Sequence, residues 1–244
     1  MRELDRNHIP RSCAIVGAGR LGTALAAALR ATGLDVDGPL GRGSAPRAPV
    51  VLLCVPDGEI ANAAAAIPPG PLVGHCSGAT GLDVLRPHEG FGLHPLMTVP
   101  ADGAPPFAGA GCAVAGTTPR AEACARALAE RLGMRPATVA DEDRAAYHAA
   151  ASIAANFLVT LEGAAERLAA TAGVERSQLA PLVRAAVENW ARLGAADALT
   201  GPIARGDEAT VARQRDAVAQ RCPDLLPAWD ALAELTRDLA RVPA

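Results

Sequence analysis

Two polar side chains that could move a proton stand at the ends of apolar runs in the first half of the chain. Ser77 follows the run Pro71–Cys76, and His94 ends the run Phe91–His94. A hydroxyl and an imidazole at neighbouring strand ends can pass a proton to or from a substrate oxygen or nitrogen. We predict that His94 is a general acid/base and Ser77 its partner. The alternative is a structural histidine that closes a strand before Pro95.

A stripe of polar residues interrupts an alanine-rich stretch further along the chain. His148, Ser152 and Asn156 are spaced four residues apart, so in an α-helix they share one face. We predict that His148 and Asn156 belong to the catalytic site and orient the substrate, and that Ser152 contacts the substrate. Contact with a partner helix would explain the same spacing.

A loop rich in glycine and proline, Leu199–Asp207, carries an isolated arginine. An arginine in such a loop suits a carboxylate ligand. We predict that Thr200 or Arg205 anchors the acid group of a small-molecule substrate. In the alternative, Arg205 pairs with Asp207, which is also a suitable N-cap for a following helix. The spacing of histidines and cysteines predicts no metal site.

A glycine-rich turn near the start of the chain indicates the cofactor that this chemistry would need. The pattern glycine-x-glycine-x-x-glycine lies between a short apolar run, Cys13–Val16, and a helix-forming stretch, Thr23–Thr32. The first glycine permits a tight turn, the second lets the backbone approach a pyrophosphate, and the third lets the helix pack on the strand. We therefore predict a dinucleotide site. Its turn contributes Gly17, Gly19, Arg20, Leu21 and Gly22.

The charge after the second predicted strand favours one dinucleotide. An acidic residue about 20 residues past the glycines accepts from the ribose hydroxyls of NAD. This chain has Arg42 at that distance and Ser44 close by, which suit the 2′-phosphate of NADP. We predict NADP(H), with Asp37 as the competing candidate for NAD if the strand ends early. Further predicted cofactor contacts follow the third apolar run, at Val55, Pro56 and Asp57.

The order of the segments predicts how these residues are positioned. Strand-like and helix-like patterns alternate up to about residue 140, and ligands bind beyond the carboxyl ends of the strands in such sheets. We predict an α/β fold whose N-terminal Rossmann domain, residues 11–140, has a doubly wound, mostly parallel sheet and binds NADP. An all-α substrate domain, residues 141–244, begins with one long helix from Asp141 to about Thr171. The predicted strands are residues 14–16, 34–40, 50–55, 71–76, 91–94, 111–115 and 137–140.

Composition excludes several classes of function. The chain has 244 residues, 50% of them hydrophobic, and a net charge of −3, so it can bury a sizeable core and lacks the basic surface of a nucleic-acid-binding protein. No apolar run reaches membrane-spanning length, and the charged N-terminus lacks the apolar core of a signal peptide, so we expect a cytoplasmic protein. All 23 basic residues are arginine, as a GC-rich bacterial genome would produce, and this removes lysine as a catalytic group.

Six motifs, in this order, resemble a bacterial family of Rossmann-like proteins usually called NADP-dependent oxidoreductases, whose helical domain is the domain of unknown function 2520. They are GAGRLG, CVPD, HCSG, HPL, YHAAASIAAN and LTGPIARGD, and they span nearly the whole chain. The chain is more distantly similar to ketopantoate reductase, pyrroline-5-carboxylate reductase, the β-hydroxyacid dehydrogenases and prephenate dehydrogenase. This likeness implies a helical domain, of the 6-phosphogluconate dehydrogenase C-terminal type, that forms a homodimer and closes over the nicotinamide.

The resemblance also implies roles for single residues. His94-Pro95 and Ser77 resemble the catalytic histidine and nearby serine of prephenate dehydrogenases. Asn156 matches the asparagine in the Lys-x-x-x-Asn motif of ketopantoate reductases and β-hydroxyacid dehydrogenases, but Ser152 stands at the lysine position. We therefore expect His94 or His148 as the proton donor, or a reaction that needs little acid help, such as reduction of a protonated imine.

These features together predict an enzyme that transfers hydride from NADPH to a small carbonyl or imine compound, such as a 2-keto acid. One alternative is a protein that senses NADP(H) and performs no chemistry, and another is a dehydrogenase that works in the oxidative direction. A hydrogen bond between Ser77 and His94 beside the nicotinamide would favour the enzyme.

Overall fold

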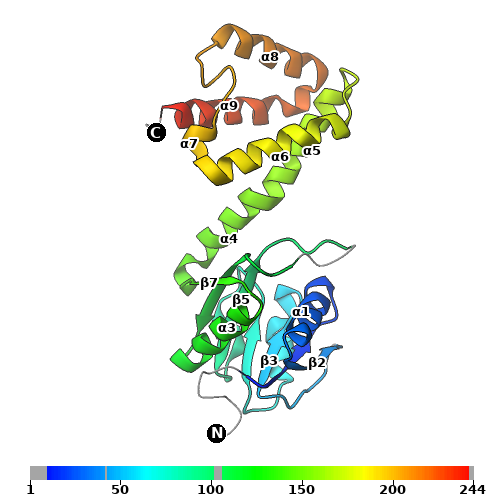
Figure 1. Ribbon diagram of the computed structural model, residues 1–244, viewed down its shortest axis with the longest axis vertical. Helices are drawn as coiled ribbons and strands as arrows, with labels where there is room; N and C mark the ends of the chain where they lie inside the picture. Colours follow the sequence, from blue (N-terminus) through cyan, green and yellow to red (C-terminus); the bar gives the residue numbers. More distant parts are fainter. Residues whose placement is uncertain (1–9, 42, 102–105, 242–244) are drawn as a thin grey trace. The chain divides into compact units, whose positions relative to one another are not determined.

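A seven-stranded sheet organises the N-terminal part of the chain (Figure 1). The computed structural model describes residues 10–41, 43–101 and 106–241. The strands lie in the order β2-β1-β3-β4-β5-β6-β7, and neighbouring strands are parallel except for the pair β5 and β6. This confirms the predicted α/β class with a mostly parallel sheet. The strands are β1 (Ser12–Val16), β2 (Asp35–Leu40), β3 (Val50–Leu53), β4 (Leu72–His75), β5 (Gly90–Leu96), β6 (Gly111–Gly116) and β7 (Arg135–Thr138).

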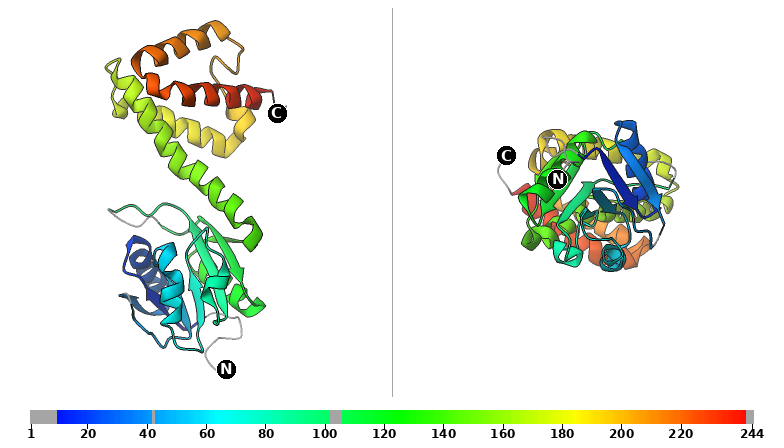
Figure 2. Two further views of the ribbon diagram at one scale, coloured as in Figure 1. Left: turned by 180° about the vertical axis from the view of Figure 1, so that it is seen from behind. Right: turned by 90° about the horizontal axis from the view of Figure 1, so that it is seen from below.

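Helices cover both faces of this sheet. Every residue of β3 is buried, as expected for a central strand of a parallel sheet. Leu25 of α1 and Leu128 of α3 belong to the hydrophobic cluster on one face, and Ile60 of α2 belongs to the cluster on the other face. The views from opposite sides in Figures 1 and 2 show this doubly wound arrangement. The three helices are α1 (Arg20–Ala31), α2 (Ile60–Ala65) and α3 (Pro119–Arg131).

The order of the strands places a ligand site at the carboxyl ends of β1 and β3. Strand β1 pairs with β2 on one side and with β3 on the other, so the chain reverses its direction across the sheet between β2 and β3. In open α/β sheets this topological switch point is where ligands bind. The glycine turn at residues 17–22 follows β1, and residues 54–57 follow β3. The predicted cofactor residues of both segments therefore meet at the switch point.

The chain forms two compact units, Met1–Ile153 and Ala154–Ala244, and the boundary lies later than the predicted one at Asp141. The reason is that α4 (Arg144–Ser152) contacts the sheet: the Tyr147 hydroxyl lies against His94 of β5. The first helical turns after Asp141 therefore belong with the sheet, although the sequence pattern assigned them to the helical domain.

The predicted long helix contains a π-helical turn, Ile153–Phe157, between α4 and α5. A π-helical turn closes hydrogen bonds over five residues instead of four, so it changes which residues share a face. Asn156 lies in this turn, and the expected stripe of His148, Ser152 and Asn156 therefore does not continue in regular α-helical register.

The described residues of the second unit form helices joined by loops, with no strand among them. The Asp207 carboxylate accepts a hydrogen bond from the Thr210 backbone N–H and caps α8, which confirms the predicted N-cap. Helices α5 and α6 contain no buried residue within the described chain. None of the described helices of either unit combines the length and hydropathy needed to cross a membrane. The helices are α5 (Leu158–Ala170), α6 (Arg176–Leu193), α7 (Ala195–Ala198), α8 (Glu208–Arg221) and α9 (Leu226–Ala240).

Candidate functional site

At the first and third glycines of the turn, the surrounding backbone leaves no room for a side chain. Gly17 has a φ of +115°, and a Cβ atom there would lie 2.2 Å from the Cys54 carbonyl oxygen. A Cβ atom at Gly22 would lie 1.9 Å from the Gly17 carbonyl oxygen. The turn is also tied to its neighbours, because the Gly17 N–H donates to the Leu40 carbonyl and the Cys54 N–H donates to the Val16 carbonyl. The backbone of this turn is thus closely fixed at the switch point.

The middle glycine is different, because a Cβ atom at Gly19 would have no described residue other than its chain neighbours within 4 Å. Gly19 is the N-cap of α1 and has no side chain with which to cap the N–H groups of the first turn. Free N–H groups at a helix N-terminus beside an open approach suit a pyrophosphate. The residues present therefore fit the dinucleotide that the glycine pattern predicts.

Ser77 and Asp57 join the ends of β4 and β3. The Ser77 hydroxyl donates to Asp57 Oδ2 over 2.8 Å, and it accepts from the backbone N–H of Thr80 over 2.9 Å. Ser77 is buried and Asp57 is exposed. This contact links a predicted catalytic residue to a predicted cofactor residue, and it fixes the loop after β4.

The predicted pairing of Ser77 with His94 is wrong, because the two side chains have different partners. His94 Nδ1 lies 2.7 Å from the Tyr147 hydroxyl of α4, and the two rings are at 87° with centroids 5.5 Å apart. Ser77 is held in its own turn and by Asp57. No hydrogen bond between Ser77 and His94 occurs among the residues that the structure describes.

His94 is neutral at physiological pH. Burial, followed by the positive charge of His148 when protonated and by Arg144, lowers the pKa of His94 from its usual 6.5 to about 4. Burial raises the pKa of the Tyr147 phenol to about 12, so Tyr147 keeps its proton. A phenol is a stronger acid than a neutral imidazole, so the arrangement in which Tyr147 donates to His94 Nδ1 is favoured. The remaining imidazole proton is then on Nε2.

Gly78 provides the space in which two histidines meet. A Cβ atom at Gly78 would lie 2.9 Å from His94 Nε2 and 2.9 Å from His148 Cδ2. The rings of His94 and His148 have centroids 6.3 Å apart. His94 and His148, which are both predicted to be catalytic residues, therefore lie near one another, with His148 exposed and His94 half-buried.

An ion pair between a buried arginine and an exposed aspartate holds α4 against the sheet. Arg144 is 4% exposed, and its Nε donates to Asp141 Oδ1 over 2.6 Å. The same carboxylate accepts from the Leu82 backbone N–H over 3.2 Å. A Cβ atom at Gly92 would lie 2.8 Å from Arg144 Nη2, so the guanidinium packs directly on β5. These contacts fix the start of α4 and hence the position of Tyr147.

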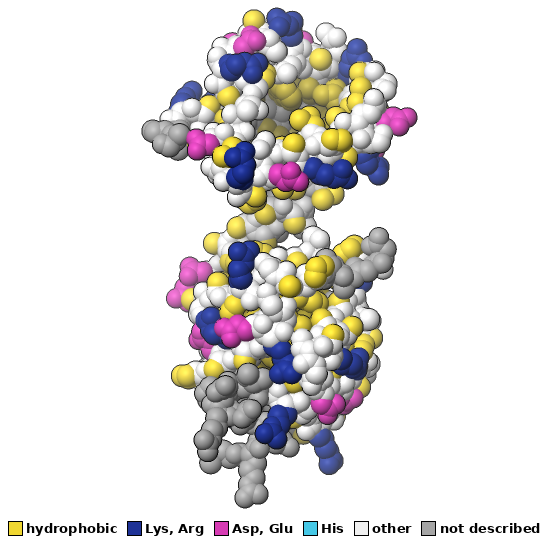
Figure 3. Space-filling view, in the orientation of Figure 1, with side chains coloured by type: hydrophobic (Ala, Val, Ile, Leu, Met, Phe, Trp, Pro, Cys, Tyr) yellow, Lys and Arg dark blue, Asp and Glu magenta, His cyan; other side chains and the backbone are white. Residues whose placement is uncertain are grey.

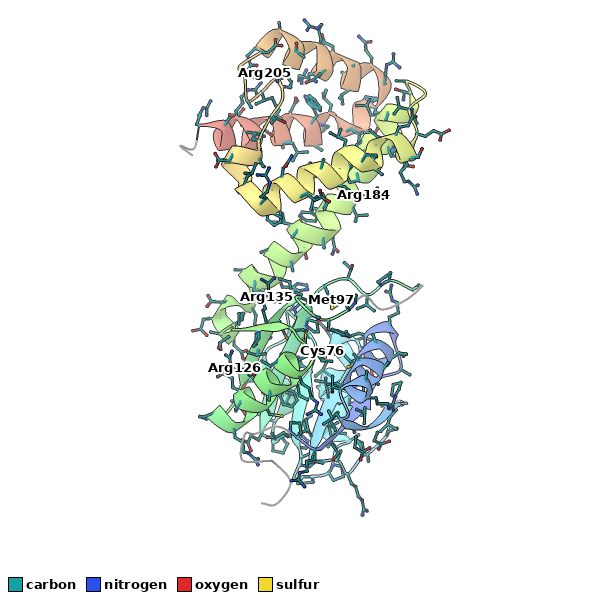
Figure 4. The ribbon with its side chains drawn as sticks, viewed as in Figure 1. Cys76, Met97, Arg126, Arg135, Arg184 and Arg205 are labelled. Atoms are coloured by element: carbon teal, nitrogen blue, oxygen red, sulfur yellow. The ribbon has the colours of Figure 1, made fainter. Side chains whose placement is uncertain are left out.

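The other predicted site residues are distributed over both units. Asn156, Thr200 and Arg205 belong to the second unit and are exposed, with Arg205 in the loop before α8 (Figure 4). The alternative pairing of Arg205 with Asp207 is not found among the ion pairs of the described chain. Ser152 is half-buried at the end of α4, and Ser44 is half-buried in the loop after β2. Arg42 lies outside the described residues.

Sequence reasoning missed three residues of the cluster. Tyr147, Arg144 and Asp141 all precede or adjoin the predicted stripe on α4. The available signal was that Tyr147 is the single tyrosine of the chain and is next to His148. Burial of an arginine could not be read from the sequence, because Arg144 is surrounded by alanines and acidic residues that resemble an exposed helix start.

The parallel sheet, the glycine turn and the switch point define the class of the protein, which is a Rossmann-like dinucleotide-binding fold followed by a helical unit. The family model described as a domain of unknown function, DUF2520, matches residues 110–236. The chain belongs to this family, as its motifs predicted. No curated protein sequence matches the chain.

Solved structures share the whole fold at low sequence identity. A Bacteroides fragilis protein described as a candidate NADP oxidoreductase is 20% identical and has a TM-score of 0.80, with 93% of this chain and 98% of that chain covered. A Thermotoga maritima protein is 22% identical with a TM-score of 0.77 over 93% and 98%. Pyrroline carboxylate reductase of Plasmodium falciparum, solved with NADP bound, is 12% identical with a TM-score of 0.61 over 94% and 98%.

Proposed function

We propose that the chain is an NADPH-dependent reductase of a small imine or carbonyl compound that carries a carboxylate. The observation that carries this proposal is the open backbone at Gly19, set between two glycines that the fold itself requires. Arg20, Leu21, Val55, Pro56 and Asp57 would complete the dinucleotide site at the switch point. Bound NADPH would supply the hydride. Several proteins of the same fold are described as NADP-dependent reductases, which supports the choice of cofactor.

The position of Asp37 favours NADP over NAD. Strand β2 continues to Leu40, and Asp37 pairs in register with Ala14 inside the ladder. Asp37 therefore does not stand at the carboxyl end of the strand, where the ribose-binding acid of NAD sites stands. The loop after the strand holds Arg42 and Ser44, which we propose as the ligands of the 2′-phosphate.

The neutral state of His94 favours an imine over a ketone. With a pKa of about 4, only about one His94 in 1,000 carries a proton at pH 7, so His94 is a poor general acid there. A protonated imine already carries the charge that helps hydride addition and needs no further proton. His94 would then use Nε2–H as a hydrogen-bond donor that orients the substrate, while His148 lies at the exposed side of the cluster. Arg205 or Thr200 would bind the substrate carboxylate, with Ser152 and Asn156 as further contacts.

The test is NADPH oxidation against a panel of cyclic imines, semialdehydes and 2-keto acids. We expect turnover with a carboxylated cyclic imine. Because His94 would orient the substrate, we expect His94→Ala to reduce kcat by about 100-fold with little change in NADPH affinity. His88→Ala is the matched control, because His88 contacts the Ala64 carbonyl away from the cluster. Full turnover in the His94 variant would remove His94 from the mechanism.

A second candidate function is an NADP(H)-sensing protein without catalysis. The hydrogen bond from the Ser77 hydroxyl to Asp57 favours this second function. Because Ser77 is engaged there, His94 does not have the serine partner that the proton-transfer prediction requires. Tight NADPH binding with no turnover on any member of the panel would support the sensor and contradict the reductase.

We also propose that the protein is a homodimer that forms through the second unit. Several large apolar side chains of this unit are exposed, among them Val159 at 72%, Leu182 at 68% and Trp190 at 58%. Helices α5 and α6, which carry them, have no buried residue in the described chain. The space-filling view shows hydrophobic side chains at the surface of this unit (Figure 3). A second copy of the same helices would cover them with a self-complementary apolar face.

A further inference from the structure

A pair of thiols lies at the edge of the dinucleotide site. Cys54 follows β3, and Cys76, labelled in Figure 4, follows β4. Their Sγ atoms are 3.7 Å apart, and both side chains pack in the hydrophobic cluster on the α1 side of the sheet. Neither thiol takes part in the proposed reaction. The remaining four cysteines are free and buried.

The backbone already places these two residues within reach of a disulfide. The parallel ladder of β3 and β4 pairs Leu53 with His75, and the Cys76 N–H donates to the Leu53 carbonyl. The two cysteines are therefore the next neighbours across strands that lie about 4.8 Å apart. Disulfides need Cα separations of about 4.4–6.8 Å, so only the sulfur atoms must move closer.

The two thiols differ in accessibility, and this difference predicts which of them is oxidised first. Cys54 is half-buried and is the one cysteine that is not fully buried. Hydrogen bonding to Cys54 and burial raise the pKa of Cys76 well above its usual value. An oxidant from solvent therefore meets Cys54 first, and Cys76 acts as the resolving thiol.

We propose that Cys54 and Cys76 form a redox-modification site that closes to an intramolecular disulfide in the presence of a peroxide. The peroxide oxidises the Cys54 thiol to a sulfenic acid and is reduced to water. The Cys76 sulfur then attacks the Cys54 sulfur, an S–S bond forms, and the sulfenic oxygen leaves as water with the Cys76 proton. A thiol reductant reverses the modification.

The disulfide would act on the dinucleotide turn, a consequence that rests on the proposed function. The Cys54 carbonyl borders Gly17, and a Cβ atom at Gly22 would lie 3.1 Å from Cys54 Cβ. A bond from the Cys54 sulfur to Cys76 therefore constrains the residue against which both glycines pack. We expect the oxidised protein to bind NADPH about tenfold more weakly.

The experiment treats the full chain with hydrogen peroxide, blocks residual thiols and digests with trypsin and a glutamyl protease without reductant. Cleavage after Arg47, Glu59 and Glu89 separates the two cysteines into peptides 48–59 and 60–89. We expect these peptides to be linked in the wild type and in the Cys112→Ser control, and free in Cys54→Ser. Cys76→Ser should leave a sulfenic acid on Cys54 that dimedone traps. If the variant at the buried Cys76 does not fold, the comparison of Cys54→Ser with the wild type still tests the proposal.

Unlinked peptides in the wild type, or a link that involves another cysteine or a second chain, would overturn the proposal. NADPH titration of the reduced and oxidised protein separates the two claims. If the disulfide-linked protein binds NADPH with unchanged affinity, the disulfide forms but does not weaken the dinucleotide site, and only that second claim is overturned. A reduced protein that binds no NADPH would instead contradict the proposed function.

Discussion

The Tyr147 hydroxyl lies 2.7 Å from Nδ1 of His94, and this contact joins the first helix after the sheet to strand β5. Because Tyr147 keeps its proton and His94 is neutral, the contact selects the imidazole tautomer with its proton on Nε2. That nitrogen borders Gly78, where His148 also lies. The relationship thus determines which nitrogen of His94 a substrate would meet.

Replacement of Tyr147 by phenylalanine should disturb the tautomer of His94 without unfolding the protein. Loss of the hydroxyl leaves Nδ1 without its donor, so we expect both neutral tautomers to be populated. The ¹⁵N NMR shifts of the His94 ring measure this directly, and we expect kcat to fall by about tenfold with an unchanged KM for NADPH. Unchanged ring shifts in Tyr147→Phe would show that the contact does not select the tautomer.

The stability of the fold should decrease as the pH falls from 6.5 to 4. In this window an unfolded His94 binds a proton, whereas the folded residue, with its pKa of about 4, does not. The unfolded state therefore gains protons first, and the free energy of unfolding decreases by at most about 3 kcal/mol. Denaturation by urea at a series of pH values measures this slope. The slope should be shallower in His94→Gln, and an identical slope would contradict the low pKa.

The ion pair of Arg144 and Asp141 should be asymmetric in its contribution to stability. The Arg144 side chain is 5% exposed, whereas that of Asp141 is 48% exposed. Asp141→Ala leaves a buried guanidinium without its partner and should cost about 2 kcal/mol. Arg144→Met leaves a carboxylate that water can solvate, and it should cost about 1 kcal/mol. The reverse order in urea denaturation would show that the arginine is not held by this carboxylate.

The proposed dimer should depend on Trp190 of α6. Trp190 is 58% exposed in the single chain, so Trp190→Glu should leave the fold intact and place a charge in the proposed interface. We expect the variant to be monomeric by light scattering coupled to size-exclusion chromatography. Gln214→Glu, which adds the same charge at an exposed position of α8, should remain dimeric. A dimeric Trp190→Glu would place the interface elsewhere.

The sequence predicted the sheet and the dinucleotide turn well because both depend on local patterns. Buried apolar runs specify β1 and β3, and the glycine spacing specifies a turn in which Gly17 and Gly22 have no room for a side chain. The polar cluster was harder to predict because its contacts connect distant segments. Ser77 follows β4 as predicted, whereas His94 lies within β5, which continues to Leu96 beyond the predicted end. Their partners, Asp57 and Tyr147, depend on how the loops and α4 pack. The boundary at Asp141 moved for the same reason.

The central claim is that the open backbone at Gly19 receives the dinucleotide, and titration of NADPH into the wild type and Gly19→Ala tests it most directly. A Cβ atom at position 19 meets none of the described residues beyond its chain neighbours, so the variant should keep its stability. We predict that the wild type binds NADPH at one site per chain and that Gly19→Ala binds it at least about tenfold more weakly. Equal affinity in the two proteins, or no binding by the wild type, would contradict the account.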